Sequence, residues 1–295
     1  MIVFYAFFRV CSFFVSRLPF PVIYFFSDIL KFLLQYVIRY RRDVTRRNLT
    51  HSFPEKSAQE IKKIEDRYYR NLADVILEVI KLEAVSKNSL MKRFSFEGLE
   101  IMQDAFNHGR SVLVATGHLG NWEWMGTVLG MSLKEKGFAI IKPLAEKHFH
   151  DYLISLRHRF NQDSTIDFQH TLRRLVRNKK EMLTFNVFAS DQTPTKADIN
   201  HWKTFLNKET PFYTGIEKLA KSLDFSVVFM NISRTSRGRY KGEIRLITDN
   251  PVSMKELEIT DIYIKMLEEA IINQPDNWLW SHRRWKFERT VPAGK

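Results

Sequence analysis

The strongest constraint on the fold is an alternation of short apolar runs with helical segments, which begins near residue 94. The apolar runs are rich in branched and aromatic side chains, as buried strands are, and amphipathic stretches of helical spacing separate them. The expected strands are 111–116, 138–142, 182–189, 225–231 and 242–248. The expected helices are 98–108, 121–136, 146–160, 169–179, 212–223 and 257–273. This order favours an α/β fold with a central, mostly parallel sheet flanked by helices.

The first 38 residues are of a different kind, dense in Phe, Ile, Leu, Val and Tyr but interrupted by charged residues. No uncharged run reaches the roughly 18 residues of a clean spanning helix, and no small-residue cleavage site indicates a signal peptide. Polar residues recur instead at helical steps on both sides of the break 19-PFP-21. They are Arg9, Ser12 and Ser16 before it, and Asp28, Lys31, Gln35, Arg39 and Arg42 after it. Each half is therefore expected to be a helix with a broad apolar face and a narrow polar stripe.

Three arrangements of this N-terminal segment are open from the sequence. The helices could lie in a bilayer interface, pack as a pair on the protein's own core, or form a single tilted spanning helix. The stretch 39-RYRRDVTRRNL-49 carries five arginines against one aspartate, which favours anionic lipid and the cytoplasmic side. We therefore predict a membrane-associated segment at 1–45 and a catalytic domain at 46–295. Ser57 and Glu60 are the expected capping box of the domain's first helix.

The net charge of +13 indicates an anionic partner, which could be nucleic acid, an acidic lipid surface or an acidic protein. No nucleic-acid-binding motif is present, and the Phe-rich start favours lipid, so no nucleic acid partner is expected. The basic cluster 173-RRLVRNKK-180 suits an acidic carrier protein or glycolipid phosphates, and equally a solvated helix face. The single cysteine, Cys11, excludes an intramolecular disulfide. No H-E-x-x-H motif occurs, so no metal site is expected.

The motif with the clearest chemical potential is 117-GHLGNWEWMG-126. His118 follows the expected strand 111–116, at the edge of a parallel sheet where ligands gather. Glu123 is expected to accept a hydrogen bond from one ring nitrogen of His118, which leaves the other free to take a proton. No G-x-S-x-G elbow is present, so the pair would activate a hydroxyl or amine of a bound substrate. The spacing alone is also typical of an unreactive surface or core histidine.

The segment 117-GHLGNWEW-124 resembles the His-x4-acid box of glycerolipid acyltransferases, in the form found in bacterial lipid A biosynthesis acyltransferases. Four further segments resemble that family in the same order. They are 47-RNLTHSFPEKSAQEI-61, 190-SDQTP-194, 209-ETPFYTGIEKLA-220 and 275-PDNWLWSHRRWKF-287. The resemblance implies a glycerolipid acyltransferase-like fold on the cytoplasmic face of the inner membrane, with the closing segment packed beside the active site.

The family resemblance also implies the reaction and its residues. A fatty acyl chain passes from acyl carrier protein, or from acyl-CoA, to a hydroxyl of a lipid A precursor, without a cofactor. His118 is the implied base and Glu123 its partner. The oxyanion donors are expected among Asn121, Lys142 and the backbone amides of 117–121. The remaining pair is Asp191 and Gln192, which position the substrate or, alternatively, cap a turn.

One departure from the family pattern leaves the acceptor open. The family usually has arginine before proline where this chain has 141-IKP-143, and lysine supplies charge without the bidentate fork. An amino-acid-based lipid or a lysophospholipid is therefore an alternative acceptor. A thioesterase, in which water replaces the acceptor, is a second alternative, and a non-enzymatic basic protein that binds nucleic acid is a third.

Overall fold

The computed structural model describes residues 2–289 and confirms the α/β fold. Its centre is a seven-stranded sheet with the order β1-β9-β8-β2-β5-β3-β4. The strands are β1 (Phe94–Glu97), β2 (Val112–Thr116), β3 (Lys136–Ile141), β4 (Thr165–Asp167), β5 (Thr184–Ala189), β8 (Ser226–Ser236) and β9 (Arg239–Thr248). Within the described residues, β8 and β9 are the one antiparallel pair of this sheet, and the other neighbours run parallel.

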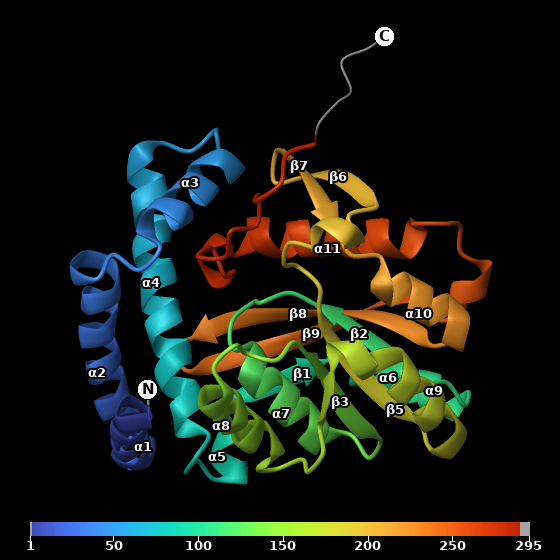
Figure 1. Cartoon of the computed structure of the whole chain (residues 1–295), viewed down its shortest axis with the longest axis horizontal. Helices are drawn as coiled ribbons and strands as arrows, with labels where there is room; N and C mark the ends of the chain where they lie inside the picture. Colours follow the sequence, from blue (N-terminus) through green and yellow to red (C-terminus); the bar gives the residue numbers. More distant parts are fainter. Residues whose placement is uncertain (1, 290–295) are drawn as a thin grey trace.

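Helices cover both faces of the sheet, with α11 on one face and α7 and α8 on the other (Figure 1). The helices of this part are α5 (Lys87–Met91), α6 (Leu99–Asn107), α7 (Trp122–Ser132), α8 (Lys147–His158), α9 (Thr171–Glu181), α10 (Gly215–Leu223) and α11 (Glu258–Asn273). The central strand β2 is buried along its whole length, because a parallel strand between two helical layers has no solvent-facing side. That burial explains why its sequence is an uninterrupted apolar run.

Four short strands were not predicted from the sequence. Two are β1 and β4, of four and three residues, at the two edges of the sheet. The others form the separate hairpin of β6 (His201–Phe205) and β7 (Lys208–Phe212). Leu206 and Asn207 connect this hairpin, and both have positive φ, as a tight two-residue turn requires. These strands contain too few apolar residues to stand out by hydrophobicity.

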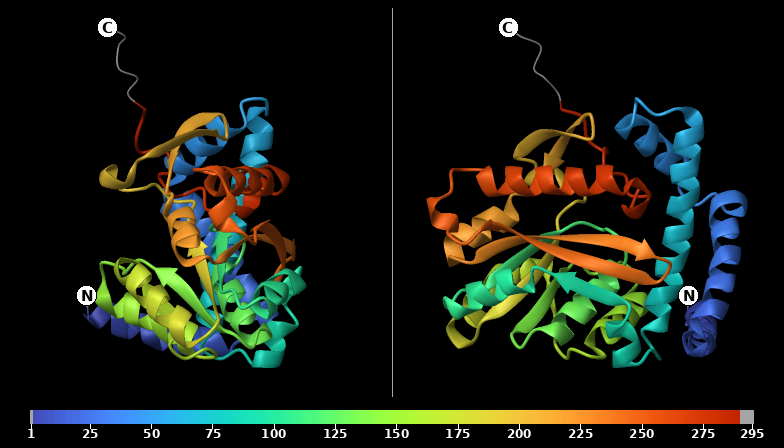
Figure 2. Two further views of the ribbon diagram at one scale, coloured as in Figure 1. Left: turned by 90° about the vertical axis from the view of Figure 1, so that its right-hand side faces the viewer. Right: turned by 180° about the vertical axis from the view of Figure 1, so that it is seen from behind.

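The N-terminal segment is helical on both sides of the predicted break. It consists of α1 (Ile2–Arg17) and α2 (Phe20–Phe32), which continues through one π-helical turn (Leu33–Val37). The chain then forms α3 (Arg42–Ser52) and the long helix α4 (Ala58–Lys81), which opens with the predicted capping box of Ser57 and Glu60. Figure 2 shows α1 and α2 alongside α4, at one end of the sheet.

The polar stripe of α1 and α2 faces the protein, and their apolar faces point outward. Ser27 donates to Asp74 of α4 at 2.5 Å, and Lys31 pairs with Asp66 of the same helix. The outward side consists of large side chains that are 38–83% exposed: Val3, Phe4, Phe7, Val10, Phe13, Phe14, Val22, Phe25, Phe26, Ile29, Phe32, Leu33, Tyr36, Val37 and Ile38. A surface helix in water has the opposite orientation, with its apolar face toward the protein and its polar face toward solvent. By length and composition, Phe20–Val37 could also cross a membrane.

Candidate active site

The candidate site forms where β2 and β5 end side by side. Thr116 pairs with Ala189 in parallel register, so the two chains leave the sheet together. His118 and Asp191 each follow their paired residue by two positions, and this common offset brings them into contact. Two of the residues predicted from the sequence therefore lie in contact at the carboxyl edge of the sheet, where ligands bind in parallel sheets.

Asp191 holds the imidazole of His118. Its Oδ1 lies 2.6 Å from His118 Nδ1, and its Oδ2 accepts from the backbone N–H of His118 at 2.9 Å. Trp278 Nε1 donates to the same Oδ2 at 2.7 Å, so the closing segment packs beside the site as predicted. The Asp191 side chain is 3% exposed and that of His118 is 18% exposed. The contact makes Nδ1 the protonated nitrogen and directs the lone pair of Nε2 toward the open side.

The predicted hydrogen bond between Glu123 and His118 is wrong. Glu123 lies in the first turn of α7 and faces α8, where Arg157 donates to its two carboxylate oxygens at 2.6 and 2.8 Å. A bidentate charge-assisted pair is stronger than a hydrogen bond from a neutral imidazole, which explains the choice of partner. Glu123 still lines the same cavity as His118. Arg157 was not singled out from the sequence.

The buried charges around His118 act together on its proton affinity. Burial opposes a charge on the imidazole, but the Asp191 carboxylate outweighs burial and raises the pKa of His118, with a smaller contribution from Glu123. Burial likewise opposes ionisation of Asp191, yet His118 and Trp278 hold its pKa well below the ordinary range. Arg157 similarly keeps the pKa of Glu123 below its usual value against the effect of burial. Both carboxylates are therefore anionic at neutral pH.

The Asn121 side chain and several loop amides, all predicted as oxyanion donors, form hydrogen bonds within the fold instead. Asn121 is fully buried and caps α7, since its Oδ1 accepts from Trp124 N at 2.9 Å while its Nδ2 donates to Glu78 at 2.7 Å. The expectation that Asn121 faces a substrate is therefore wrong. Three of the predicted loop amides are used as well. His118 N donates to Asp191, Leu119 N to Gly117 O, and Gly120 N to Asn277 O.

Lys142 and Gln192 do face the cavity. Lys142 follows β3, and among the described residues no carboxylate forms an ion pair with it. Gln192 Nε2 lies 3.3 Å from His118 Nε2, so its amide donates to the nitrogen that Asp191 leaves free. A substrate hydroxyl that reaches Nε2 would replace this weak contact.

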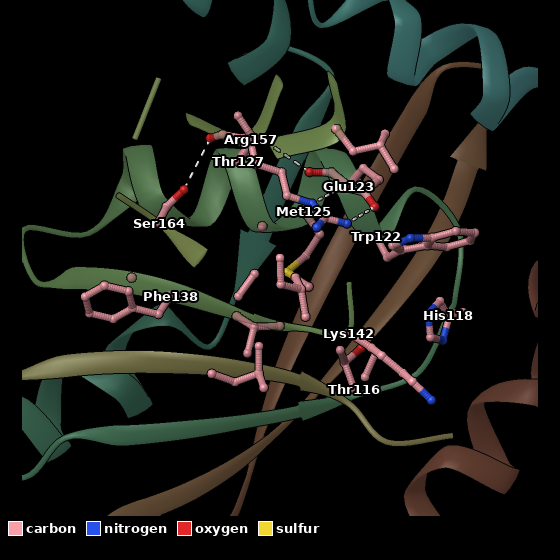
Figure 3. A pocket seen from close by; sticks show the side chains of 18 of the residues that line it. Thr116, His118, Trp122, Glu123, Met125, Thr127, Phe138, Lys142, Arg157 and Ser164 are labelled. Carbon is pink, nitrogen blue, oxygen red and sulfur yellow. Dashed lines mark hydrogen bonds and ion pairs between the residues drawn. The ribbon is translucent and has the colours of Figure 1, made fainter. Parts of the chain in front are cut away.

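A cavity of about 510 Å³ extends from His118 between α7, α8 and the sheet (Figure 3). In Figure 3, His118 and Lys142 lie toward one end, and Phe138 and Ser164 toward the other. Apolar side chains supply much of its wall: Met125, Ile140, Leu153, Phe185 and Val187. The volume falls in the range of 300–1,000 Å³ that is typical of small-molecule sites. A polar mouth and an apolar interior suit an amphiphilic ligand.

Comparison with known proteins identifies the family of the chain. Residues 2–287 match the profile of the family described as bacterial lipid A biosynthesis acyltransferase. The chain is 23% identical over 283 residues to a lipid A biosynthesis palmitoleoyltransferase of Escherichia coli K12, covering 95% of this chain and 89% of the relative. A lipid A biosynthesis lauroyltransferase of the same strain is 22% identical, with the same coverage. The chain therefore belongs to the bacterial lipid A biosynthesis acyltransferase family, and it is an acyltransferase with a lipid acceptor.

Proposed function

We propose that this enzyme transfers a fatty acyl chain from a thioester donor to a hydroxyl of a lipid A precursor, with His118 as general base and Asp191 as its partner. The observation that carries the proposal is the 2.6 Å contact between His118 Nδ1 and Asp191 Oδ1 at the mouth of the cavity. Glu123, which the sequence motif suggests as the partner, instead holds Arg157 in the cavity wall.

The reaction begins with the acceptor hydroxyl in the position that Gln192 occupies at Nε2. His118 Nε2 takes the hydroxyl proton while the oxygen forms a bond to the thioester carbonyl carbon, and the carbonyl electrons move to its oxygen. Asp191 stabilises the imidazolium that results. The tetrahedral species then re-forms the carbonyl and breaks the carbon–sulfur bond. The thiolate takes the proton from His118, which yields the ester and a free thiol.

Lys142 is the proposed oxyanion donor. It lines the cavity at the same end as His118. Among the described residues, no carboxylate forms an ion pair with its ammonium group, which is therefore available to a ligand. A point charge stabilises developing negative charge without the directional fork of arginine. Because the thioester supplies an already activated acyl group, the proposed chemistry calls for no cofactor and no metal.

Acyl carrier protein is the proposed donor, with acyl-CoA as the smaller alternative. Support comes from α9, which follows β4 and carries the basic cluster 173-RRLVRNKK-180. Asp167 pairs with Ile141, so the turn at 168–170 that leads into α9 follows directly from a residue beside the segment with Lys142. The side chains of Leu172 and Val176 are 55% and 40% exposed among these cations. An exposed apolar strip among cations suits a small acidic protein.

The proposed location is the cytoplasmic face of the inner membrane. The outward apolar faces of α1 and α2 support it, because side chains of that size are stabilised by lipid and not by water. The proposed domain organisation is a membrane-associated segment at 1–45 and a catalytic domain at 46–295. Phe8 of α1 packs against Tyr152 of α8, with ring centroids 5.2 Å apart, so the membrane segment contacts a helix of the cavity wall.

The proposal is tested by transfer of labelled acyl chains from acyl carrier protein to a tetra-acylated lipid A precursor in mixed micelles. Wild type is compared with His118→Ala, and circular dichroism checks that both are folded. Transfer by the wild type that is lost in the folded variant supports the reaction and the base. Equal transfer by both would exclude His118 as the base. Transfer to lysophospholipid or to an amino-acid-based lipid, but not to the lipid A precursor, would show that the proposed acceptor is wrong. Release of free fatty acid with every acceptor would indicate a thioesterase.

A further inference from the structure

Helix α7 has a glycine in its interior, Gly126, that its own backbone does not require. Its φ is not positive, so a residue with a side chain could adopt the same conformation. A Cβ placed there would have no atom of the described residues within 4 Å, so packing does not exclude one either. Glycine is an unfavourable residue in the middle of a helix. The usual reasons for a helical glycine are therefore absent at this position.

The open space beside Gly126 is the cavity of the candidate site. Gly126 and Gly130 both line it, and they lie four positions apart on one face of the helix. Gly130 differs because a Cβ there would come within 2.4 Å of the Asn161 side chain. Gly126 is roughly 6 Å along the helix axis from Trp122, which packs against His118, and roughly 6 Å from Gly130. It therefore lies midway along the part of α7 that lines the cavity.

The surroundings of Gly126 favour an apolar occupant. Met125 of α7 and Ile140 and Val187 of the sheet line the same cavity. The polar groups farther along it already have partners, because Asn161 Nδ2 donates to Thr127 O at 3.0 Å and Ser164 Oγ to Arg157 O at 3.3 Å. A hydrocarbon chain fills such a space without leaving these donors unpaired.

We propose that Gly126 sets the width of the acyl pocket halfway along its length and thereby the length of the acyl chain that the enzyme transfers. The inference rests on the proposed function, since it takes the cavity as the acyl site. A side chain at this position would project into the pocket about one helical turn from the reacting end. Longer chains would then be blocked, and chains short enough to end before it would not.

The test compares Gly126→Ala and Gly126→Leu with Gly215→Ala as the matched control. Gly215 begins α10, is exposed, has equally open space around its Cβ position and lies outside the cavity. Each protein receives an equimolar mixture of carrier-bound saturated chains of increasing length, with one lipid acceptor. Mass spectrometry of the products then gives the chain-length profile.

We expect the ratio of kcat/KM for the longest to the shortest accepted chain to fall about tenfold or more in Gly126→Leu, because each excluded methylene affects selection strongly. Gly126→Ala should show a smaller change in the same direction, and Gly215→Ala none. An unchanged profile in the Gly126 variants would overturn the inference. The alanine variant keeps the test decisive if the leucine variant does not fold, since alanine favours a helix. No transfer of any chain by the wild type would instead refute the proposed function.

Discussion

Replacement of Asp191 by asparagine removes the charge beside His118 and keeps the shape of the side chain. The charges of an imidazolium and of this carboxylate are centred about 4 Å apart, which corresponds to about 4 kcal/mol at an effective dielectric constant near 20. Since about 1.4 kcal/mol changes a rate tenfold, kcat/KM should fall about 10³-fold. This loss appears because the charge on His118 develops only as the hydroxyl proton is taken.

The pH dependence gives a second, independent readout of the same change. His118 acts as a base only when neutral, so kcat/KM should rise with pH through the His118 pKa, which Asp191 raises above its ordinary value of about 6.5. In Asp191→Asn the midpoint should move to lower pH, although the plateau rate is far lower. The measurement is acyl transfer under kcat/KM conditions from pH 5 to 9, corrected for the folded fraction.

The matched variant is Glu123→Gln, which tests the partner that the sequence motif suggests. It leaves the Arg157 guanidinium without its carboxylate, so its main effect should be on the melting temperature. Its kcat/KM per folded enzyme should stay within about tenfold of the wild type, a smaller effect than loss of the partner itself. The reasoning is refuted if the two variants exchange these results, with Glu123→Gln slower by three orders of magnitude and Asp191→Asn nearly unaffected.

Three further predictions concern other parts of the chain. Lys142→Met should lower kcat about 10²-fold or more while Lys142→Arg retains most of it, and comparable loss in both would exclude a role for charge in oxyanion stabilisation. Ser57→Ala should lower the free energy of unfolding by about 1 kcal/mol through loss of the cap of α4, as measured by urea titration, and an unchanged midpoint would contradict this. Phe13→Ser combined with Phe25→Ser should weaken sedimentation with anionic vesicles without lowering the melting temperature, because both side chains are exposed, and equal binding would exclude these faces as the lipid contact.

Much of the fold could be predicted from the sequence because the buried strands of a parallel sheet are continuous apolar runs. β2, β5 and β8 stand out for that reason, and the helices between them show the helical period. The hairpin of β6 and β7 did not, because each of its strands is five residues long and contains few large apolar residues.

The candidate site was predicted in its parts but not in its pairing. Asp191 was recognised, yet only the register of β2 with β5 shows that it lies as far beyond its strand as His118 does. The sequence does not reveal which strands are neighbours, so it led to Glu123, the carboxylate nearer in sequence, as the partner of His118. Arg157 lies 34 positions after Glu123, and nothing in its local sequence distinguishes it from the other arginines.

The inward polar stripe of α1 and α2 has a practical consequence for handling this protein. Helix α4 buries Glu65, Asp74 and Glu78 completely, and residues of the N-terminal segment pair with all three. Lys81 likewise donates to the carbonyls of Ser16 and Leu18. A chain shortened to begin after the apolar segment would lose the hydrogen bonds that Tyr24 and Ser27 donate to α4 and the carbonyls that accept from Lys81. Each such bond to a charged group contributes about 1.5–3 kcal/mol. Truncation is thus the wrong route to a water-soluble enzyme, whereas polar substitutions on the outward face would leave the contacts with α4 in place.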